Sequence, residues 1–226
     1  MRRREPTTRD ILLENAGELF SDHGFEGVTT RMIAERAGVK LSAIHYHFGS
    51  KENLYLEACL LAASRGKGIT FDDICAENPG LLQSPAGQAE IVRTTIFRNF
   101  NDHFRSDRPR WESKLVLLEI VSPTTAMAVL VEKVFKPDAE SARRFYQIVN
   151  PEATDREAQA WSDLMYGTIL LYSMARRTIE AVRGPGSQSP EYYRIAATKL
   201  SRAMCLEAGL PLPPDLRKTG YAHRPP

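Results

Sequence analysis

The sequence predicts an all-helical (all-α) protein with a small N-terminal domain and a larger C-terminal helical bundle. Apolar residues recur at helical spacing through most of the chain, and serine, threonine, glycine and proline stand where helices would begin and end. No stretch has the pattern of a convincing strand. We therefore expect one helical domain at residues 1–58, a second at 59–210, and a Pro-rich disordered tail at 211–226.

Two longer helices frame the N-terminal domain. The first is expected at residues 10–23, where Leu12, Ala16 and Leu19 belong to one apolar stripe and Gly24 ends the helix. The other is expected from residue 51 to about residue 64, with its apolar side facing inward. This second helix leads directly into the C-terminal bundle.

The segment between them predicts a helix-turn-helix. Two threonines supply hydroxyl groups before an unbroken helical stretch at residues 31–37, and Gly38 favours the left-handed turn that ends it. A second short helix is expected at residues 42–48, ended by Gly49. A short helix, a glycine turn and another short helix make up the helix-turn-helix pattern.

The remaining helices are separated by proline and glycine. Ser84 and Ser189 each precede a proline at the first helical position, and Thr154 opens a capping box. Pro137 should bend or interrupt the helix that contains it. Residues 66–80 are expected to form a loop or a short helix. The expected helices span residues 85–105, 110–121, 124–149, 154–182 and 190–208.

The outer side of the second short helix carries small residues and polar rings. Small residues let a helix sink into the major groove of DNA, and ring N–H, O–H and ammonium groups can reach phosphates and base edges. The residues of this side and its flanks are Arg31, Lys40, Ser42, Ala43, His45, Tyr46, His47 and Lys51. Alternatively, the three rings are half-exposed surface residues on an ordinary helical hairpin.

Several short runs occur here in a fixed order. They are Phe25-Glu-Gly-Val-Thr-Thr, Ile33-Ala34, Ala37-Gly38-Val39, and Tyr46-His-Phe-Gly-Ser-Lys-Glu with Leu54. This order resembles the DNA-binding domain of tetracycline-repressor-type (TetR-family) transcriptional regulators over about residues 8–58. Trp111, Leu118-Glu119, Pro123 and a proline-interrupted helix make the C-terminal part similar to the variable domain of the same regulators, closest to the CecR-type subgroup.

The resemblance implies a fold and roles for individual residues. The fold is an N-terminal helix-turn-helix domain with a helical bundle for ligand binding and dimerisation. Thr30, His47 and Lys51 match positions that contact phosphates, and Arg31 matches a position that contacts either phosphates or bases. Leu41, Ser42 and His45 match positions that face bases. Leu41 also fits the apolar stripe of its helix, so it is expected either in the core or against a thymine methyl group.

Net charge gives no argument for nucleic-acid binding. The whole chain carries +2, and residues 1–67 hold ten Lys or Arg and nine Asp or Glu, so a basic surface has to come from the placement of charges. Arg2, Arg3 and Arg4 form the one basic cluster. It is either a solvated tail or a flexible arm that lies on the phosphate backbone or in a minor groove.

The sequence shows no pattern typical of a membrane protein, a metal site or a catalytic site. No apolar run approaches the length of a membrane span, so we expect no membrane partner and a cytoplasmic location. The three cysteines are far apart and the histidines show no metal-ligand spacing, so we expect no metal and no cofactor. No nucleophile–base spacing appears either, so we expect no catalytic residues and no enzyme.

The C-terminal helices predict a homodimer. Apolar residues cover more than one face of the helix at 154–182, which requires a second packing partner, either inside the bundle or in another copy of the chain. The resemblance favours two copies joined through the last two helices. The residues expected in this contact are Leu171, Tyr172, Tyr193, Ala196, Leu200 and Met204.

Aromatic residues and methionines in the same domain predict an apolar cavity for a lipophilic or aromatic effector. Its expected lining is Phe97, Phe100, His103, Phe104, Trp111, Glu119, Met127, Phe135, Trp161, Met165 and Tyr166. The alternative for each of these residues is ordinary core packing, because aromatic residues at helical spacing are usually core.

These expectations combine into one function. We expect a homodimeric, sequence-specific transcriptional regulator that binds double-stranded DNA at a pseudo-palindromic operator, and specifically a repressor released by a small molecule. The alternative is a helical adaptor whose helix-turn-helix binds protein instead of DNA. Steep loss of affinity with rising salt separates the two, because it is the mark of a protein that binds DNA phosphates.

Overall fold

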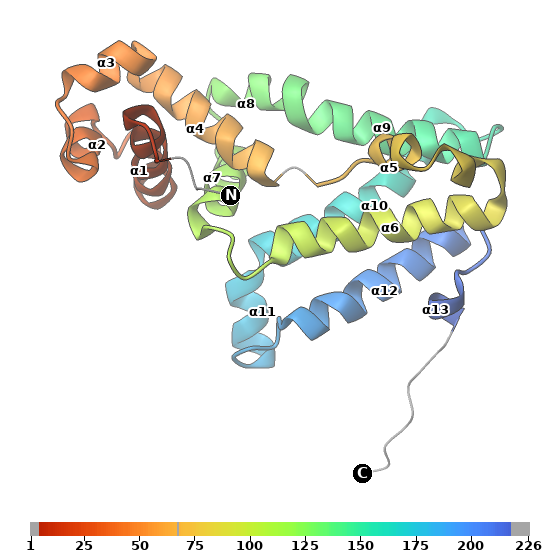
Figure 1. The fold of residues 1–226 in the computed structure, drawn as a ribbon. Coiled ribbons are helices and arrows are strands. Elements are labelled where there is room, and N and C mark those ends of the chain that lie inside the picture. The colour runs from red at the N-terminus through yellow and green to blue at the C-terminus, as the bar shows by residue number, and fades with distance from the viewer. Residues whose placement is uncertain (1–4, 67, 218–226) are drawn as a thin grey trace. The chain divides into compact units, whose positions relative to one another are not determined.

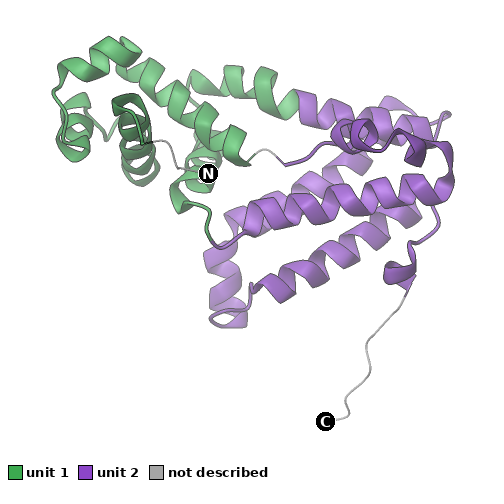
Figure 2. Cartoon of the chain, viewed as in Figure 1, with its two compact units in different colours: residues 1–67, 107–136 green, residues 68–106, 137–226 purple. Residues whose placement is uncertain are grey.

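The computed structural model describes residues 5–66 and 68–217, and every regular element in those ranges is a helix, which confirms the predicted class (Figure 1). The chain forms two compact units, each assembled from two stretches of sequence (Figure 2). Unit 1 contains residues 1–67 and 107–136, and unit 2 contains residues 68–106 and 137–226. The predicted boundary at residue 58 differs from this division, because residues 107–136 return to the N-terminal unit.

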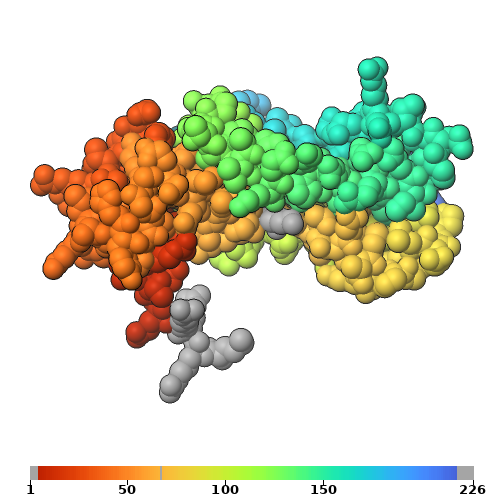
Figure 3. All heavy atoms as spheres, turned by 90° about the horizontal axis from the view of Figure 1, so that it is seen from above, coloured from red at the N-terminus to blue at the C-terminus, as the bar shows by residue number. Residues whose placement is uncertain are grey.

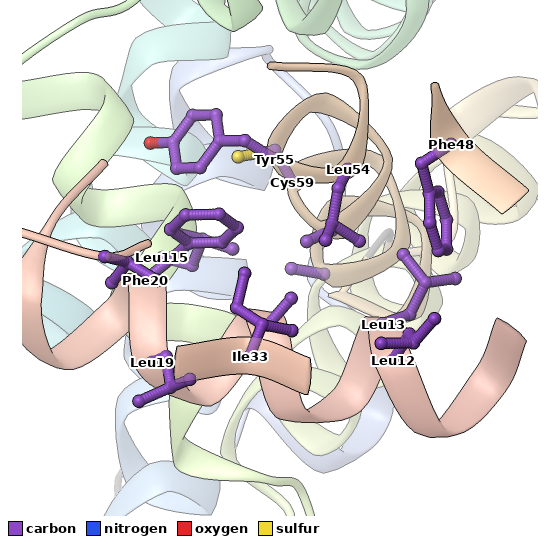
Figure 4. Close-up of a cluster of buried hydrophobic side chains, with 14 of the residues drawn as sticks. Leu12, Leu13, Leu19, Phe20, Ile33, Phe48, Leu54, Tyr55, Cys59 and Leu115 are labelled. Atoms are coloured by element: carbon purple, nitrogen blue, oxygen red, sulfur yellow. The ribbon is translucent and has the colours of Figure 1, made fainter. Parts of the chain in front are cut away.

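Unit 1 is built around a single apolar core. Its helices are α1 (Thr8–His23), α2 (Thr30–Ala37), α3 (Ser42–Phe48), α4 (Lys51–Gly66), α7 (Arg110–Val121) and α8 (Ala126–Leu130), followed by the π-helical turn η2 (Val131–Phe135). Leu12, Ile33, Ile44, Leu54 and Leu115 come from five different helices and are all fully buried. Figure 4 shows such side chains converging from these helices. The shared core holds the short helices α2 and α3, which could not persist alone.

Helix α1 begins earlier than the sequence predicts. The hydroxyl oxygen of Thr7 accepts a hydrogen bond from the backbone N–H of Asp10 (3.2 Å), and the Asp10 carboxylate accepts one from the backbone N–H of Thr7 (2.9 Å). This is a capping box, so Asp10 is the third residue of the helix rather than its first.

Helix α7 is fastened to α1 and α4. The indole ring of Trp111 lies against Gly17 of α1, where an added Cβ would come within 2.3 Å of the ring, and its N–H donates to Glu14 (3.2 Å). The hydroxyl group of Tyr55, in α4, donates to the buried carboxylate of Glu119 (2.8 Å). Burial raises the pKa of Tyr55, so its hydroxyl keeps the proton that it donates. Unit 1 therefore includes α7 as an integral part.

A buried carboxylate at the start of α7 strengthens this attachment. Glu112 is 1% exposed and accepts hydrogen bonds from the guanidinium groups of Arg108 (3.1 Å) and Arg65 (3.2 Å). Arg65 lies in the last turn of α4 and also pairs with Glu14 of α1. Three helices of unit 1 thus share one network of charges, in which each buried charge has an opposite charge beside it.

Unit 2 contains the longest helices. Its elements are α5 (Phe71–Glu77), the 3-10 turn η1 (Pro79–Gln83), α6 (Pro85–Phe104), α9 (Lys136–Val149, whose first residue ends unit 1), α10 (Asp155–Met174), α11 (Arg176–Arg183), α12 (Pro190–Glu207) and α13 (Pro214–Arg217). Helix α6 packs along α12, with the rings of Phe104 and Tyr193 stacked 4.0 Å apart. A second aromatic group joins Phe71, Phe145 and Trp161. Aromatic packing therefore dominates the core of unit 2.

The helix predicted at residues 154–182 is two helices. It starts as expected, since Thr154 and Glu157 form the capping box, but it breaks at Ala175, with φ −91° and ψ 12°. Beyond the break, the side-chain amide of Gln188 donates to the backbone carbonyl of Arg176 (3.2 Å). A contact from twelve residues further along the chain satisfies this carbonyl, and no local sequence signal announces such a contact.

Pro137 disturbs its helix as predicted, through a π-helical turn. A proline has no N–H, so a normal α-helical hydrogen bond to the carbonyl four residues earlier is impossible at this position. The chain widens into η2 just before Pro137 and returns to α-helical geometry in α9.

The C-terminal segment is more ordered than predicted as far as residue 217. Pro214–Arg217 forms the short helix α13, and Leu216 is buried. Burial of this leucine supplies the free energy that a Pro-rich segment on its own lacks. Residues 218–226 lie outside the described residues.

No single helix in the described ranges has both the length and the hydropathy of a membrane span. The bent pair of Arg110–Val121 with Ala126–Val149 meets both criteria when taken together.

The network around Glu112 predicts a large effect of a small change. Glu112→Gln removes the negative charge and leaves the Arg108 guanidinium buried without an opposite charge, which should lower the free energy of unfolding by about 3–5 kcal/mol. The matched control is Glu35→Gln, which breaks the solvent-exposed pair of Arg31 and Glu35 and should leave the free energy of unfolding nearly unchanged. Urea unfolding followed by circular dichroism measures both. Equal costs for the two variants would contradict the interpretation.

Candidate nucleic-acid interface

Local sequence signals fix both ends of the helix-turn-helix. The hydroxyl oxygen of Thr29 accepts from the backbone N–H of Met32 (3.2 Å) and starts α2. Gly38 ends α2 in the left-handed conformation, with φ 66° and ψ 29°. A residue with a Cβ would be strained there by about 1–2 kcal/mol. The predicted turn is therefore present, and α3 follows it over the predicted residues.

The seven residues of α3 have one buried and one exposed side. Ile44 and Phe48 lie in the core of unit 1. Leu41, the residue just before α3, is 45% exposed and Tyr46 is 85% exposed, so the core holds neither side chain. Figure 3 shows the orange atoms of this part of the chain at the molecular surface. Leu41 thus lies outside the core, and its role as a contact residue stays a prediction.

The other predicted contact residues lie beside this exposed side. Lys40, Ser42 and His45 are exposed, whereas Thr30 and His47 are half-buried. Arg31 is exposed and forms an i,i+4 ion pair with Glu35 (2.8 Å). Solvent screens an exposed ion pair of this kind, so Arg31 can exchange Glu35 for a phosphate at little cost.

The ring of His45 is oriented by a backbone group. Its Nδ1 atom lies 3.0 Å from the carbonyl oxygen of Gly49, the residue that ends α3. The backbone N–H of Gly49 in turn donates to the carbonyl of His45 (3.0 Å). The first contact holds the ring against the end of the helix, and the second is the last backbone hydrogen bond of α3.

Lys51 is tied into unit 1. Its ammonium group donates to the backbone carbonyl of Val28 (2.9 Å) and lies over the ring of Phe25, 4.1 Å from the ring centre. These contacts join the start of α4 to the turn before α2. An ammonium group has three donors, so a phosphate contact remains compatible with this position. Lys51 therefore fixes the geometry of the motif besides any role toward a phosphate.

Two positioning residues were not predicted from the sequence. The side-chain amide of Asn53 donates to the backbone carbonyl of Phe48 (3.1 Å) and satisfies a carbonyl at the end of α3. The guanidinium group of Arg9 lies over the ring of Phe48 and pairs with Glu57 of α4. The spacing of Asn53 five residues after Phe48 gave a weak signal, whereas Arg9 is 39 residues away and gave none.

The residues predicted to line a ligand cavity are distributed over both units. Trp111, Glu119 and Met127 belong to unit 1, where the first two hold α7 in place. Phe100, Trp161 and Met165 are buried in the core of unit 2, and Phe97, His103, Phe104 and Tyr166 are half-buried in the same unit. The hydroxyl group of Tyr166 donates to the backbone carbonyl of Asp138 (2.9 Å).

The residues predicted for a dimer contact divide by exposure. Tyr193 and Met204 are buried within unit 2, whereas Leu171 is 55% exposed. Tyr172, Ala196 and Leu200 are half-buried and line an open groove of about 290 Å³ on α10 and α12. The rest of its lining is Thr168, Tyr192, Ile195 and Lys199.

The core of each unit also holds a buried thiol, Cys59 in unit 1 and Cys205 in unit 2. Burial raises the pKa of Cys59 and of Cys205 to about 12, so both stay protonated near neutral pH and react poorly. Among residues 5–66 and 68–217, no group of three or more His, Cys, Asp or Glu side chains could hold a metal ion.

Known proteins match both parts of the chain. The family model for bacterial regulatory proteins of the tetR family matches residues 12–58, and the model for the C-terminal domain of the HTH-type transcriptional dual regulator CecR matches residues 91–209. CecR of Shigella flexneri is 30% identical over 71% of this chain and 73% of its own length. The HTH-type transcriptional repressor AcnR of Corynebacterium glutamicum is 38% identical over 38% of this chain, a match that spans only 43% of AcnR.

Solved structures show the same fold at low sequence identity. AmtR of Mycobacterium smegmatis is 21% identical with a TM-score of 0.53, and the match covers 94% of this chain and 99% of AmtR. A transcriptional regulator of Aquifex aeolicus is 17% identical with a TM-score of 0.52, over 88% of this chain and 99% of that chain. Together with the family models and the exposed helix-turn-helix, these matches lead to one conclusion: the chain belongs to the tetR family of bacterial regulatory proteins.

Proposed function

We propose that this DNA-binding transcriptional regulator is a homodimeric repressor that a small apolar effector releases from a pseudo-palindromic operator. It works in the cytoplasm, with the DNA that it binds. The observation that carries the proposal is the two-sided character of α3 and its N-cap residue: Ile44 and Phe48 hold the helix, while Leu41, His45 and Tyr46 are left exposed. An exposed side of this kind fits a major groove, where side chains read base edges.

The charges near α3 suit a modest number of phosphate contacts. Arg31 and Lys40 are exposed, and Lys51 keeps two of its three donors beyond the bond to Val28. Each phosphate contact by such a residue releases about one counterion, so binding should weaken as salt rises. An adaptor that binds protein through an apolar contact would lack this steep dependence.

The exposed apolar side chains of unit 2 support the proposed dimer. Leu164, Leu171 and Met174 on α10 and Ile195 on α12 are exposed although they are large and apolar, and the groove between the two helices adds to the same surface. Apolar area of this kind marks a contact with another protein. One α3 reads too few base pairs for useful specificity, whereas two copies place two such helices in successive major grooves.

The core of unit 2 supports an effector with an apolar body and a polar group. Thr95 on α6, Ser162 on α10 and Ser201 on α12 are buried among apolar side chains, and their hydroxyl groups have no hydrogen-bond partner in the described part of the chain. Buried polar groups without partners are uncommon because each costs free energy. An effector whose polar group reaches one of these hydroxyls would satisfy it, and it would shift the dimer toward the state that it fits better.

Selection from a random pool of short duplexes tests the proposed function. The purified full chain is incubated with the pool, bound duplexes are sequenced, and the complexes are sized by light scattering. The expected result is an enriched pseudo-palindrome bound by two copies of the chain. Enrichment of no sequence, at low as well as physiological salt, would contradict the proposal and favour the adaptor.

Substitution of Lys51 separates its two roles. Lys51→Met should reduce the slope of log affinity against log salt by ~1 on every sequence, because one phosphate contact is lost. It should also lower the free energy of unfolding by about 1–3 kcal/mol, because the carbonyl of Val28 loses its donor. Salt titrations and urea unfolding measure the two effects.

The matched control is Lys40→Met, since Lys40 is exposed and is likewise predicted to contact DNA. It should reduce the salt slope without changing stability. An unchanged slope in Lys51→Met would limit Lys51 to its structural role.

Substitution of Leu171 tests the dimer. Leu171→Glu places a charge on the exposed apolar surface and should raise the dimer dissociation constant by roughly 30-fold, which corresponds to ~2 kcal/mol. Val121→Glu changes an exposed apolar residue of unit 1 and should leave the dimer intact. Analytical ultracentrifugation measures both. A dimer that Leu171→Glu does not weaken would place the contact elsewhere.

A further inference from the structure

The contact between His45 and Gly49 determines which ring nitrogen carries the proton. A carbonyl oxygen can only accept a hydrogen bond, and the carbonyl of Gly49 lies 3.0 Å from Nδ1 of His45. Nδ1 must therefore be the protonated nitrogen. In a neutral imidazole the other nitrogen, Nε2, is then a bare acceptor.

The acceptor is available to a ligand. His45 is exposed on α3, and in residues 5–66 and 68–217 no hydrogen bond to its Nε2 is present. The hydrogen bond from Nδ1 to the carbonyl of Gly49 orients the ring, so Nε2 is presented in one direction. A fixed acceptor selects its partners by their ability to donate.

Donors are rare in the major groove. Guanine offers two acceptors there, thymine offers an acceptor and a methyl group, and phosphates offer only acceptors. The exocyclic amino groups of adenine (N6) and cytosine (N4) are the donors. A bare Nε2 therefore complements adenine and cytosine, and it faces guanine, thymine and phosphate with lone pair against lone pair.

We propose that His45 reads an exocyclic amino group, that of an adenine or a cytosine, by accepting a hydrogen bond at Nε2. This inference rests on the proposed function and adds the class of base that one residue selects. It also divides the work of the motif: the cationic groups of Arg31, Lys40 and Lys51 attract acceptors on the phosphate backbone, while His45 excludes bases that lack a donor.

The tautomer is tested first, in the free full-length protein. Long-range ¹H–¹⁵N correlation spectra distinguish the two neutral forms of each histidine, and the spectrum of His45→Gln assigns the signals of His45 by their loss. The expected result is a protonated Nδ1 and a bare Nε2. A protonated Nε2 in the neutral ring would overturn the proposal whatever the DNA experiments show.

The base contact is tested by deleting single atoms from the DNA. The base pair whose preference changes in His45→Ala is located on the enriched duplex, and its amino group is then removed, with purine in place of adenine or 2-pyrimidinone in place of cytosine. The wild-type chain should lose roughly 2- to 12-fold in affinity, the range for one net hydrogen bond. His45→Ala should lose little, and this difference isolates the contact from any effect on the duplex itself.

A second analogue tests the opposite role of the ring. Replacement of a purine by its 7-deaza form removes the N7 acceptor and should leave wild-type affinity unchanged at the same base pair. Sensitivity to the loss of N7 but not to the loss of the amino group would show that His45 donates, which overturns the proposal. Equal sequence preference in the wild type and in His45→Ala would overturn it as well. Failure to bind any duplex would instead overturn the proposed function, so the two failures are distinguishable.

Discussion

The structure depends on holding a seven-residue helix in place from one side. A helix of this length is unstable alone in water, because too few hydrogen bonds form to offset the entropy of nucleation. Ile44 and Phe48 pack α3 against the core of unit 1. Asn53 donates to the carbonyl of Phe48 at the end of α3, and Lys51 donates to the carbonyl of Val28 before α2. All of these contacts lie on the buried side of α3 or at the ends of the motif. The other side of α3 does not pack against the core.

This division explains the exposed residues of α3. A surface position that does not contribute to packing can carry any side chain, so Tyr46 at 85% exposure has no structural reason to be aromatic. Exposed aromatic and apolar residues next to a histidine with a fixed ring are better explained by recognition than by stability. The near neutrality of the domain agrees with this explanation, because specificity for a sequence comes from base contacts and not from total charge.

The attachment continues from α4 into α7. Tyr55 and Glu119 form a buried hydrogen bond between these helices. Glu112 accepts hydrogen bonds from Arg65 of α4 and from Arg108, which precedes α7. Buried polar contacts of this kind have strict geometric requirements, unlike apolar packing, so they favour one arrangement of the helices over nearby ones. A displacement of α7 would therefore be transmitted to α4, which is separated from α3 by Gly49 and Ser50 alone.

Features that depend on neighbouring residues were predictable, and features that depend on distant ones were not. The caps at Thr154 and the glycine turns lie within a few residues of the helix ends that they define, so the helices and the helix-turn-helix could be predicted with near-correct boundaries. The return of α7 to unit 1 depends on Trp111 meeting Gly17, and the break at Ala175 accompanies a contact from Gln188. In the candidate site, the exposed residues were predictable from helical periodicity, whereas Arg9 and the bond from Lys51 to Val28 required the fold.

We propose that the exposed side of α3 is the surface that contacts DNA. Photo-crosslinking tests it directly, with a benzophenone amino acid in place of Tyr46 or, as a control, of the exposed Val121 on α7, which packs on α1, α4 and α8. We expect a crosslink from position 46 to the enriched duplex and none from position 121. Equal crosslinking from both positions, or a crosslink from position 46 to protein alone, would contradict it.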